Sequence, residues 1–327
     1  MSAAALVRAR GLRKGFRARG GWLGSKGPAF HAVDGVDLDI GASEIVGLVG
    51  ESGSGKSTLG RILIRLIDPD EGTLHFDGTD LLAMQGQALR RLRREFQIVF
   101  QDPYGSLNPR MKIGDAIGEP LTIHKLANGR QQRTERVAEL LTQVGLDPRM
   151  ATRYPHEFSG GQRQRVGIAR AIACGPRFLV ADEPVSALDA PVQAQIVNLL
   201  VDLQEQLDLS YLFIAHDLNL VRRICGRVVV MYFGRVVEEA SASTLYDAPR
   251  HPYTKALLAA TPSVRPGRPQ APALAGEPPS QTAPPSGCPF HPRCPEALAE
   301  CSRETPALLQ IGQGHKVACH LVGRSSP

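Results

Sequence analysis

The chain has 327 residues, of which 43% are hydrophobic and 21% charged, a composition that is ordinary for a globular protein with a real core. Its net charge of +6 is spread along the chain, which fits attraction to nucleotide phosphates or to an anionic membrane face as well as a solvated, arginine-rich surface. Aromatic residues make up only 5%, which argues against a stacking platform for single-stranded nucleic acid.

The N-terminal stretch contains no apolar run long enough for a signal peptide. Five apolar residues, Ala3 to Val7, precede an arginine, and this is shorter than the apolar core of such a peptide. The longest apolar runs, such as residues 228–233, have the length of a strand rather than the roughly 20 residues that span a bilayer. We therefore expect any work at a membrane to go through a partner protein.

Composition divides the chain into three regions. Residues 1–261 alternate strand-like and helical runs, which predicts an α/β architecture. Residues 262–286 hold eight prolines among Ala, Gly and Ser, which predicts an extended linker with little capacity for a packed core. Residues 287–327 are short and rich in cysteine.

Four apolar runs in the first region predict buried strands, at residues 45–49 (IVGLV), 98–100, 178–181 (FLVA) and 211–215 (YLFIA). Polar or glycine residues come directly after them, including Asp182 and His216. Ligands of open α/β sheets bind at the carboxyl ends of the strands. The pattern therefore predicts a ligand site at this edge of the sheet.

Residues 50–57 (GESGSGKS) fit the phosphate-binding pattern G-x-x-x-x-G-K-[ST] and stand between a predicted strand and a helical run at 58–66. The glycines allow main-chain amides to turn inward around phosphate oxygens, next to a helix N-terminus. We expect Lys56 to reach the β- and γ-phosphates and Ser57 to ligate Mg²⁺. The residues predicted to bind ATP in this segment are Gly50, Ser52, Gly53, Ser54, Gly55, Lys56, Ser57 and Thr58.

Two adjacent acids follow the predicted strand at 178–181. Asp182 suits the aspartate that holds Mg²⁺ through its water shell. Glu183 can polarise the attacking water as a general base. Adjacent acids also cap helices, but the phosphate-binding loop earlier in the chain favours the catalytic interpretation.

Residues 158–165 (FSGGQRQR) resemble the signature sequence of ABC ATPases, usually written LSGGQ, with Phe158 in place of the leucine. The resemblance implies that two such subunits enclose two ATP molecules head to tail, so that each signature segment touches the nucleotide of the other subunit. A serine and two glycines before a helix suit such an anion site. The residues that this implies are Ser159, Gly160, Gly161 and Gln162, with Asp189 of the following SALD segment.

Three further positions resemble the same family. Gln101 matches the glutamine that contacts Mg²⁺ or water and senses the transmembrane partner, and His216 matches the histidine that steadies the γ-phosphate. Phe16 matches the aromatic residue that stacks on adenine, although an aromatic residue near an N-terminal strand is often a core residue. Lys56, Glu183 and His216 are all present, which argues against a non-catalytic regulatory cassette.

Longer segments resemble the ATP-binding subunits of oligopeptide and dipeptide ABC importers, namely residues 97–111, 154–165, 181–189, 211–217, 251–258 and 287–294. The resemblance implies an ABC nucleotide-binding domain over residues 1–261, with a RecA-like core sheet, an antiparallel β subdomain and a helical signature subdomain at about 102–160. It also implies that residues 262–286 link this domain to a small Cys-rich C-terminal module at 287–327.

The same resemblance implies an ATP-hydrolysing subunit, using ATP and Mg²⁺, of a bacterial importer for di- and oligopeptides. Its partners would be a paralogous ATPase, two transmembrane permeases and an extracytoplasmic peptide-binding protein, with no nucleic acid, and it would lie peripherally on the cytoplasmic face of the inner membrane. Nickel or glutathione as cargo stays an alternative. A soluble ABC ATPase of DNA repair or translation is another, although this chain shows a single cassette.

Six cysteines are present, four of them in the last forty residues. Cys174 and Cys225 stand in apolar surroundings and are expected to be small core residues. The spacing of Cys288, Cys294, Cys301 and Cys319 matches neither a zinc ribbon nor a bacterial ferredoxin. The family resemblance favours a 4Fe-4S cluster on these four thiols. Zinc, with His291, His315 or His320 as substitute ligands, and the absence of any metal stay open.

Overall fold

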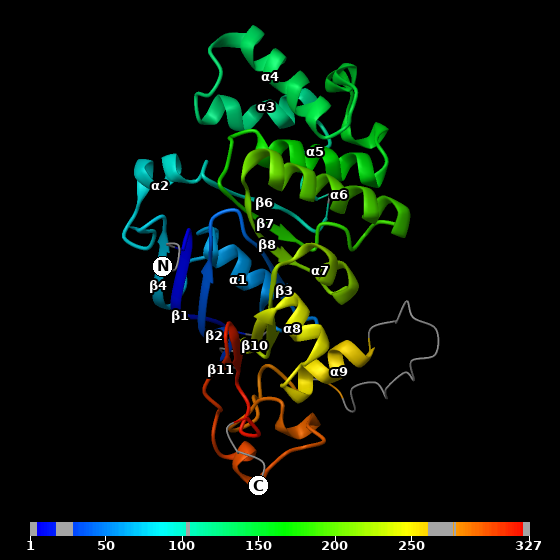
Figure 1. The fold of residues 1–327 in the computed structure, drawn as a ribbon. Coiled ribbons are helices and arrows are strands. Elements are labelled where there is room, and N and C mark those ends of the chain that lie inside the picture. The colour runs from blue at the N-terminus through cyan, green and yellow to red at the C-terminus, as the bar shows by residue number, and fades with distance from the viewer. Residues whose placement is uncertain (1–4, 18–28, 103–104, 261–276, 278, 323–327) are drawn as a thin grey trace, which may run out of the picture. The chain divides into compact units, whose positions relative to one another are not determined.

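The computed structural model describes residues 5–17, 29–102, 105–260, 277 and 279–322 (Figure 1). These residues form two compact units. The first unit contains Thr79–Ile214 with Ile40–Glu44 and the N-terminal residues up to Leu6. The second contains Val7–Asp39, Ile45–Gly78 and the residues from Ala215 onward. Most of the predicted proline-rich linker, and most of the segment between Phe16 and Phe30, lies outside the described residues.

The first unit is built on three parallel strands, β6 (Phe96–Val99), β7 (Phe178–Asp182) and β8 (Ser210–Ile214). β7 lies between the other two and pairs with both of them. Every residue of β7 and β8 is buried, as expected for parallel strands that are covered on both faces. The apolar runs predicted as strands in this part of the chain are confirmed, with small shifts of their ends.

Helices make up the rest of the first unit. α3, α4 and α5 pack against one another, and α5 also contacts α6 and β6 (green in Figure 1). The apolar positions of α5 are buried while the helix begins with small and polar residues, so its N-terminus stays near the surface. The elements of this unit besides the three strands are β5 (Thr79–Asp80), α2 (Gly86–Leu92), α3 (Ile113–Ile123), α4 (Gly129–Gln143), η1 (Pro148–Thr152), η2 (Pro155–Glu157), α5 (Gly160–Ile172) and α6 (Ala190–Leu207).

The second unit contains a mixed group of strands and an antiparallel one. β3 (Ile45–Val49) runs parallel to β9 (Arg227–Tyr232), and β9 pairs antiparallel with β10 (Arg235–Ser241). β10 pairs in turn with β12 (His315–Val317), which pairs with β11 (Leu309–Gly312). Two strands of the Cys-rich segment thus extend this group. Separately, β1 (Val7–Arg17) lies between β2 (Ala29–Ile40) and β4 (Glu71–Phe76).

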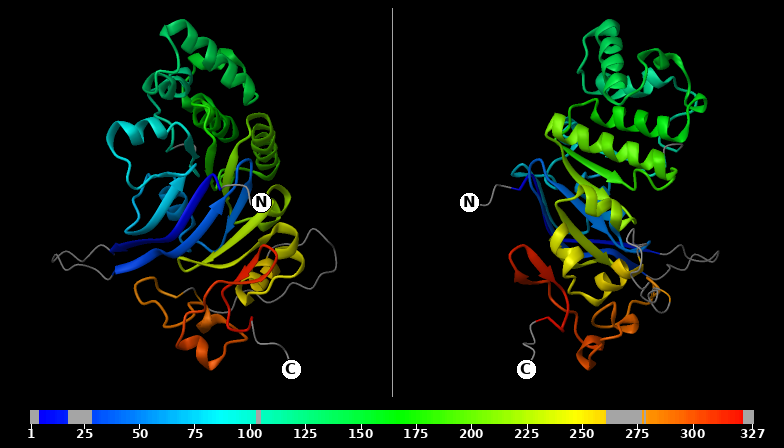
Figure 2. Two further views of the ribbon diagram at one scale, coloured as in Figure 1. Left: turned by 60° about the vertical axis from the view of Figure 1, so that its left-hand side comes forward. Right: turned by 45° about the vertical axis from the view of Figure 1, so that its right-hand side comes forward.

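Short helices connect the strands of the second unit. α7 packs on β3 and contacts α8. The C-terminal residues, orange to red in Figure 2, lie beside the yellow helix α9, where the rings of Tyr253 and Phe290 are 5.4 Å apart. The helices are α1 (Lys56–Leu63), α7 (Leu218–Ile224), α8 (Ala242–Asp247), α9 (Pro252–Ala260), η3 (His291–Arg293) and η4 (Ala299–Ser302).

Within the described part of the chain, the helices are all too short or too polar to cross a membrane.

Candidate nucleotide-binding site

The predicted phosphate-binding loop, residues 50–57, lies in the second unit between β3 and α1. Two of its glycines cannot be replaced without moving the main chain. Gly50 has φ 149° and Gly55 has φ 102°, and a Cβ atom on either would lie about 2 Å from a carbonyl oxygen, that of Met231 (2.1 Å) or of Ala32 (2.0 Å). The glycine positions of the sequence pattern therefore correspond to backbone conformations and contacts that only glycine accepts.

Lys56 is the first residue of α1 and is only 4% exposed. Its Nζ donates hydrogen bonds to the carbonyl oxygens of Gly50 (2.8 Å) and Glu51 (2.9 Å). Gly55 at the N-cap supplies no capping side chain to the helix. A buried ammonium group and the N-terminus of a helix thus meet at this loop, and both favour an anion. Ser52 is exposed in the loop, and Ser57 and Thr58 are half-buried at the start of α1.

The predicted carboxylates lie in the first unit, at the end of β7. Asp182 is 2% exposed and Glu183 is 8% exposed. Glu183 adopts the left-handed conformation, with φ 49°, and its amide donates to the carbonyl oxygen of Ile214 (3.0 Å). A non-glycine residue held in this region is strained, and such residues concentrate at functional sites.

Gln101 and Glu183, which the sequence assigns to one site, are in contact in the first unit. Its Nε2 donates a hydrogen bond of 2.7 Å to Glu183 Oε2 across a sequence separation of 82 residues. The Gln101 amide fixes the orientation of the Glu183 carboxylate. This contact places a candidate water-polarising base next to a residue whose amide can also bind water.

The signature segment forms the N-terminus of α5. Ser159 Oγ accepts from the Gln162 amide (3.3 Å), and Gln162 Oε1 accepts from the Ser159 amide (3.0 Å), which is a reciprocal capping box. Gly161 is required by packing, because a Cβ atom there would lie 2.4 Å from Val192 Cγ1 of α6. A Cβ atom on Gly160 would lie 3.3 Å from Leu188 Cδ2. These residues therefore have a local structural role in addition to any role toward a second subunit.

Asp189 caps α6, since its Oδ1 accepts from the Val192 amide at 2.9 Å. Pro191 stands in the first turn of this helix, where the missing amide hydrogen costs no hydrogen bond. A contact of Asp189 with the nucleotide of another subunit stays a prediction.

His216 and Phe16 both lie in the second unit and are both exposed. His216 stands between β8 and α7, just before Asp217, which caps α7 by accepting from the Asn219 amide (2.8 Å). Phe16 is 37% exposed, and its ring centroid lies 6.1 Å from that of Phe30. Phe16 is therefore a surface residue rather than a core residue, and a ring on the surface can stack on a planar ligand.

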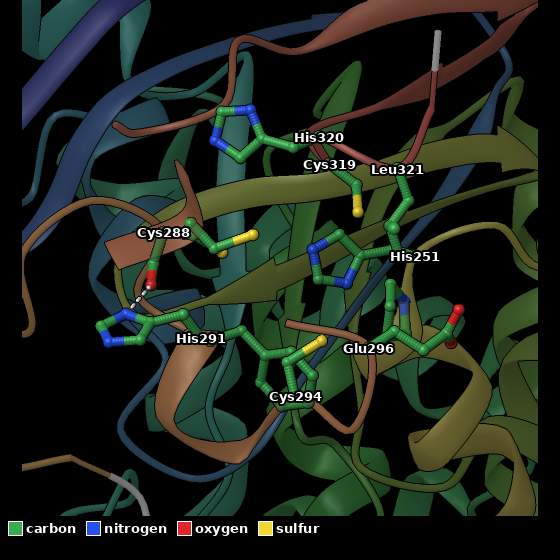
Figure 3. A pocket seen from close by; sticks show the side chains of 11 residues that line it. His251, Cys288, His291, Cys294, Glu296, Cys319, His320 and Leu321 are labelled. Carbon is green, nitrogen blue, oxygen red and sulfur yellow. Dashed lines mark hydrogen bonds between the residues drawn. The ribbon is translucent and has the colours of Figure 1, made fainter. Parts of the chain in front are cut away.

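The four cysteines of the C-terminal segment line one pocket in the second unit. Figure 3 shows Cys288, Cys294 and Cys319 directed into the same space. Burial and the neighbouring thiols raise the pKa of Cys288 and Cys294, and they raise the pKa of Cys319 to about 11. The space between the side chains is about 10 Å³, which is room for about one water molecule.

The cysteine pocket does not fit the predicted metal centre as the side chains are placed. Among the described residues, no three His, Cys, Asp or Glu side chains are arranged to hold a metal ion, and the pocket is too small for an inorganic cluster unless the thiols move apart. His291 and His320 line the pocket, but His315 Nε2 is bound to Glu238 (2.8 Å) instead. Of the two other cysteines, Cys225 is buried, as predicted, and Cys174 is half-buried.

Sequence reasoning missed the side chains that contact the phosphate-binding loop from outside. Tyr253 and Arg293 contact Glu51, and Gln281 contacts Gly53. Their separations in sequence are 202, 242 and 228 residues, so spacing carries no signal for them. Tyr253 and Arg293 fall within the family-like segments 251–258 and 287–294, which was the only available indication.

Family models match two parts of the chain. The model described as "ABC transporter" matches residues 33–186. The model described as "Oligopeptide/dipeptide transporter, C-terminal region" matches residues 237–301. The two matches together include the phosphate-binding loop, the carboxylates, α9 and three of the four clustered cysteines.

Whole-chain relatives have similar lengths. A Brucella ovis protein named as a peptide import ATP-binding protein is 49% identical over 98% of this chain and 98% of its own. The oligopeptide transport ATP-binding protein AppF of Bacillus subtilis is 48% identical, with 97% of each chain covered.

Solved structures share the fold. A dimeric ATP-binding cassette with ADP and phosphate has a TM-score of 0.64 at 31% identity, covering 72% of this chain and 98% of that one. The cbiO1 protein of Clostridium perfringens, part of an ABC transporter complex, has a TM-score of 0.63 at 25% identity, with 75% and 91% covered.

Proposed function

This chain belongs to the family of ABC transporter ATP-binding proteins, and from that premise we propose that it energises the import of di- and oligopeptides across the cytoplasmic membrane. Members of this family hydrolyse ATP, and the match to the peptide-transporter C-terminal region supports the cargo class. The observation that carries the proposal is the loop at residues 50–57, in which glycine geometry, a buried lysine and a helix N-terminus together form an anion site.

The loop holds the phosphates of ATP in this proposal. Lys56 exchanges its present carbonyl partners for the β- and γ-phosphates, and the neighbouring main-chain amides surround them. Ser57, Gln101 and Asp182 would hold Mg²⁺, which would supply neutralisation of charge on the phosphates. The exposed Phe16 would stack on adenine. The remaining loop contacts come from Gly50, Ser52, Gly53, Ser54, Gly55 and Thr58.

Glu183 is the general base for the attacking water. Its carboxylate is nearly buried and is oriented by Gln101 at 2.7 Å, and it accepts a proton from the attacking water. His216 steadies the γ-phosphate during the reaction. Cleavage transfers the terminal phosphoryl group to water, with ADP as the leaving group.

A second ATPase subunit completes each nucleotide site. We assign Ser159, Gly160, Gly161 and Gln162 to the ATP held by the partner subunit, because α5 begins at these residues and offers its N-terminus to an anion. We assign Asp189 to the same contact, because it stands at the start of α6, which packs against α5. The further partners are two transmembrane permeases and an extracytoplasmic peptide-binding protein. The chain then lies peripherally on the cytoplasmic face of the inner membrane.

The Cys-rich residues 287–327 form a C-terminal module after the linker 262–286 in this proposal, and the ATPase domain comprises residues 1–261. The module is assigned no iron–sulfur or zinc centre, because its thiols are not placed as metal ligands within the described residues and enclose too little space.

Uptake of a labelled dipeptide in cells that carry a deletion of this gene tests the proposal. Wild-type chain is expected to restore uptake, and Lys56→Ala is not. Restored uptake of nickel or glutathione, with none of the dipeptide, would replace the cargo assignment. Dipeptide uptake that does not depend on this chain would contradict the proposed role in peptide import.

A further inference from the structure

The phosphate-binding loop is held from outside by three side chains of the C-terminal region. The Glu51 amide donates to the Tyr253 hydroxyl (2.8 Å), and Gln281 Nε2 donates to the carbonyl oxygen of Gly53 (2.7 Å). Arg293 forms two parallel hydrogen bonds with the Glu51 carboxylate, from Nη1 (2.7 Å) and Nη2 (3.0 Å). All of these residues belong to the second unit.

The ion pair between Arg293 and Glu51 is largely buried and has two-point geometry, and both features strengthen it. The Arg293 side chain is 5% exposed and that of Glu51 is 24% exposed, so solvent screens the pair weakly. Two-point contact between guanidinium and carboxylate fixes orientation as well as distance. The bond to Glu51 also raises the pKa of Arg293, which keeps the guanidinium charged.

Arg293 is itself held rigidly. It ends the short helix η3, between Cys288 and Cys294, and its Nη1 also lies 3.4 Å from the Tyr232 hydroxyl. Phe290 packs against the rings of Tyr232 (5.3 Å) and Tyr253 (5.4 Å). A guanidinium anchored in this way can fix the position of the loop residue that it binds.

The loop needs such support because of its own composition. Gly50, Gly53 and Gly55 all have positive φ angles, and glycine loses more conformational freedom on ordering than any other residue. Contacts that order the loop before ATP arrives remove part of this cost from the binding step. The amide of Glu51 is already bound to Tyr253, so this contact sets which way one peptide of the loop faces.

We propose that Arg293 is a positioning residue for nucleotide binding, which holds the phosphate-binding loop in its binding conformation through Glu51. The Cys-rich segment thereby sets the affinity of the chain for ATP. The inference rests on the proposed role of residues 50–57, and Arg293 itself touches no nucleotide.

Equilibrium binding of magnesium-ATP and steady-state hydrolysis by the full chain test this inference. Arg293→Gln and Glu51→Gln are each expected to weaken ATP binding about tenfold, within the range of coupling between residues in contact. KM should rise accordingly while kcat stays within about twofold, because the groups at β7 are untouched. Arg293→Lys, which keeps the charge but not the two-point contact, should lie between wild type and Arg293→Gln.

The double variant gives the sharpest comparison. If both residues act through one contact, Arg293→Gln with Glu51→Gln should bind ATP about tenfold, rather than about a hundredfold, more weakly than wild type. Glu51 is on the more exposed side of the pair, so its variant keeps the test available should the Arg293 variant not fold.

Arg227→Gln is the matched control. Arg227 forms a part-buried ion pair with Glu239 (2.6 Å) and donates to the carbonyl oxygen of Asp39 (2.6 Å) in the same unit. It should lower stability without changing ATP affinity. Unchanged affinity in Arg293→Gln and Glu51→Gln, or equal weakening in Arg227→Gln, would overturn the inference alone. Unchanged affinity in Lys56→Ala would overturn the proposed function and the inference with it.

Discussion

At the residue scale, the proposed hydrolysis depends on the positions of the Glu183 and Gln101 side chains. Glu183 is held in a left-handed conformation by its position after β7, and its carboxylate is bound to Gln101. The backbone at this position costs about 1–3 kcal/mol relative to a relaxed one. The strands around Glu183 hold it in this conformation despite the cost. Strained residues of this kind concentrate at functional sites.

Replacement of Glu183 by glutamine should separate binding from hydrolysis. The amide keeps the size of the side chain and can still accept the hydrogen bond from Gln101, but it cannot take a proton from water. We expect nucleotide affinity close to that of wild type and turnover reduced by roughly 10²–10⁴.

Steady-state phosphate release and equilibrium nucleotide binding measure the two effects of this change. Glu135→Gln is the control, because Glu135 also accepts from a glutamine amide, that of Gln131 (3.0 Å), on the exposed face of α4. Its turnover should equal that of wild type. Near-normal turnover in Glu183→Gln would remove Glu183 from its role.

At the element scale, the start of α5 combines packing with the proposed contact to the partner's ATP. The capping box of Ser159 and Gln162 fixes the first turn, and Gly161 lets α5 approach Val192 of α6 closely. The segment thus has a structural reason for its small residues that is independent of nucleotide. To separate the packing role of Gly161 from its proposed contact with the partner's ATP, an experiment must change Gly161 and restore its packing against Val192.

Gly161→Ala should destabilise the chain by about 1–3 kcal/mol, because its methyl group overlaps Val192 Cγ1. Val192→Ala removes that atom, so the double variant should regain most of the stability in urea unfolding. Its ATP turnover should stay low, since the added methyl also occupies the helix end that is proposed to face the partner's phosphate.

Gly167→Ala is the control for this pair of variants. It lies in the same helix, with nothing within 4 Å of an added Cβ, and should be neutral or slightly stabilising. Turnover that recovers together with stability in the Gly161 and Val192 double variant would make Gly161 a packing residue only.

The sequence predicted the elements whose signals are local. The four predicted apolar runs correspond to β3, β6, β7 and β8, because parallel strands covered on both faces have nearly continuous apolar sequences. β11 and β12 have four and three residues, which is too short for an alternating pattern to stand out. The contact of Arg293 with Glu51 joins residues 242 positions apart, and no local pattern encodes such a pair.

The geometry of the four clustered cysteines also depends on contacts that no local sequence pattern encodes. The sequence suggested that the four thiols come together, and they do line one pocket. The expected metal centre came from family likeness alone, whereas the size of the pocket is set by the packing of Phe290, His251 and the surrounding side chains. Side-chain packing of this kind cannot be read from the spacing of cysteines.

At the scale of the whole molecule, the proposed chemistry draws on both units. The phosphate-binding loop, Phe16 and His216 belong to the second unit, and the carboxylates, Gln101 and the signature helix belong to the first. Relatives at 48–49% identity cover nearly the full length of the chain, so both units are part of the same ATPase.

Release of phosphate from magnesium-ATP by the purified chain, alone and mixed with the proposed paralogous subunit, tests whether residues 50–57 form an ATPase site. We expect the wild-type chain to retain magnesium-nucleotide and release phosphate, and Lys56→Ala to do neither to a measurable extent. If the wild-type chain, in either form, neither held the nucleotide nor produced phosphate, the assignment of an ATPase site to residues 50–57 would be contradicted.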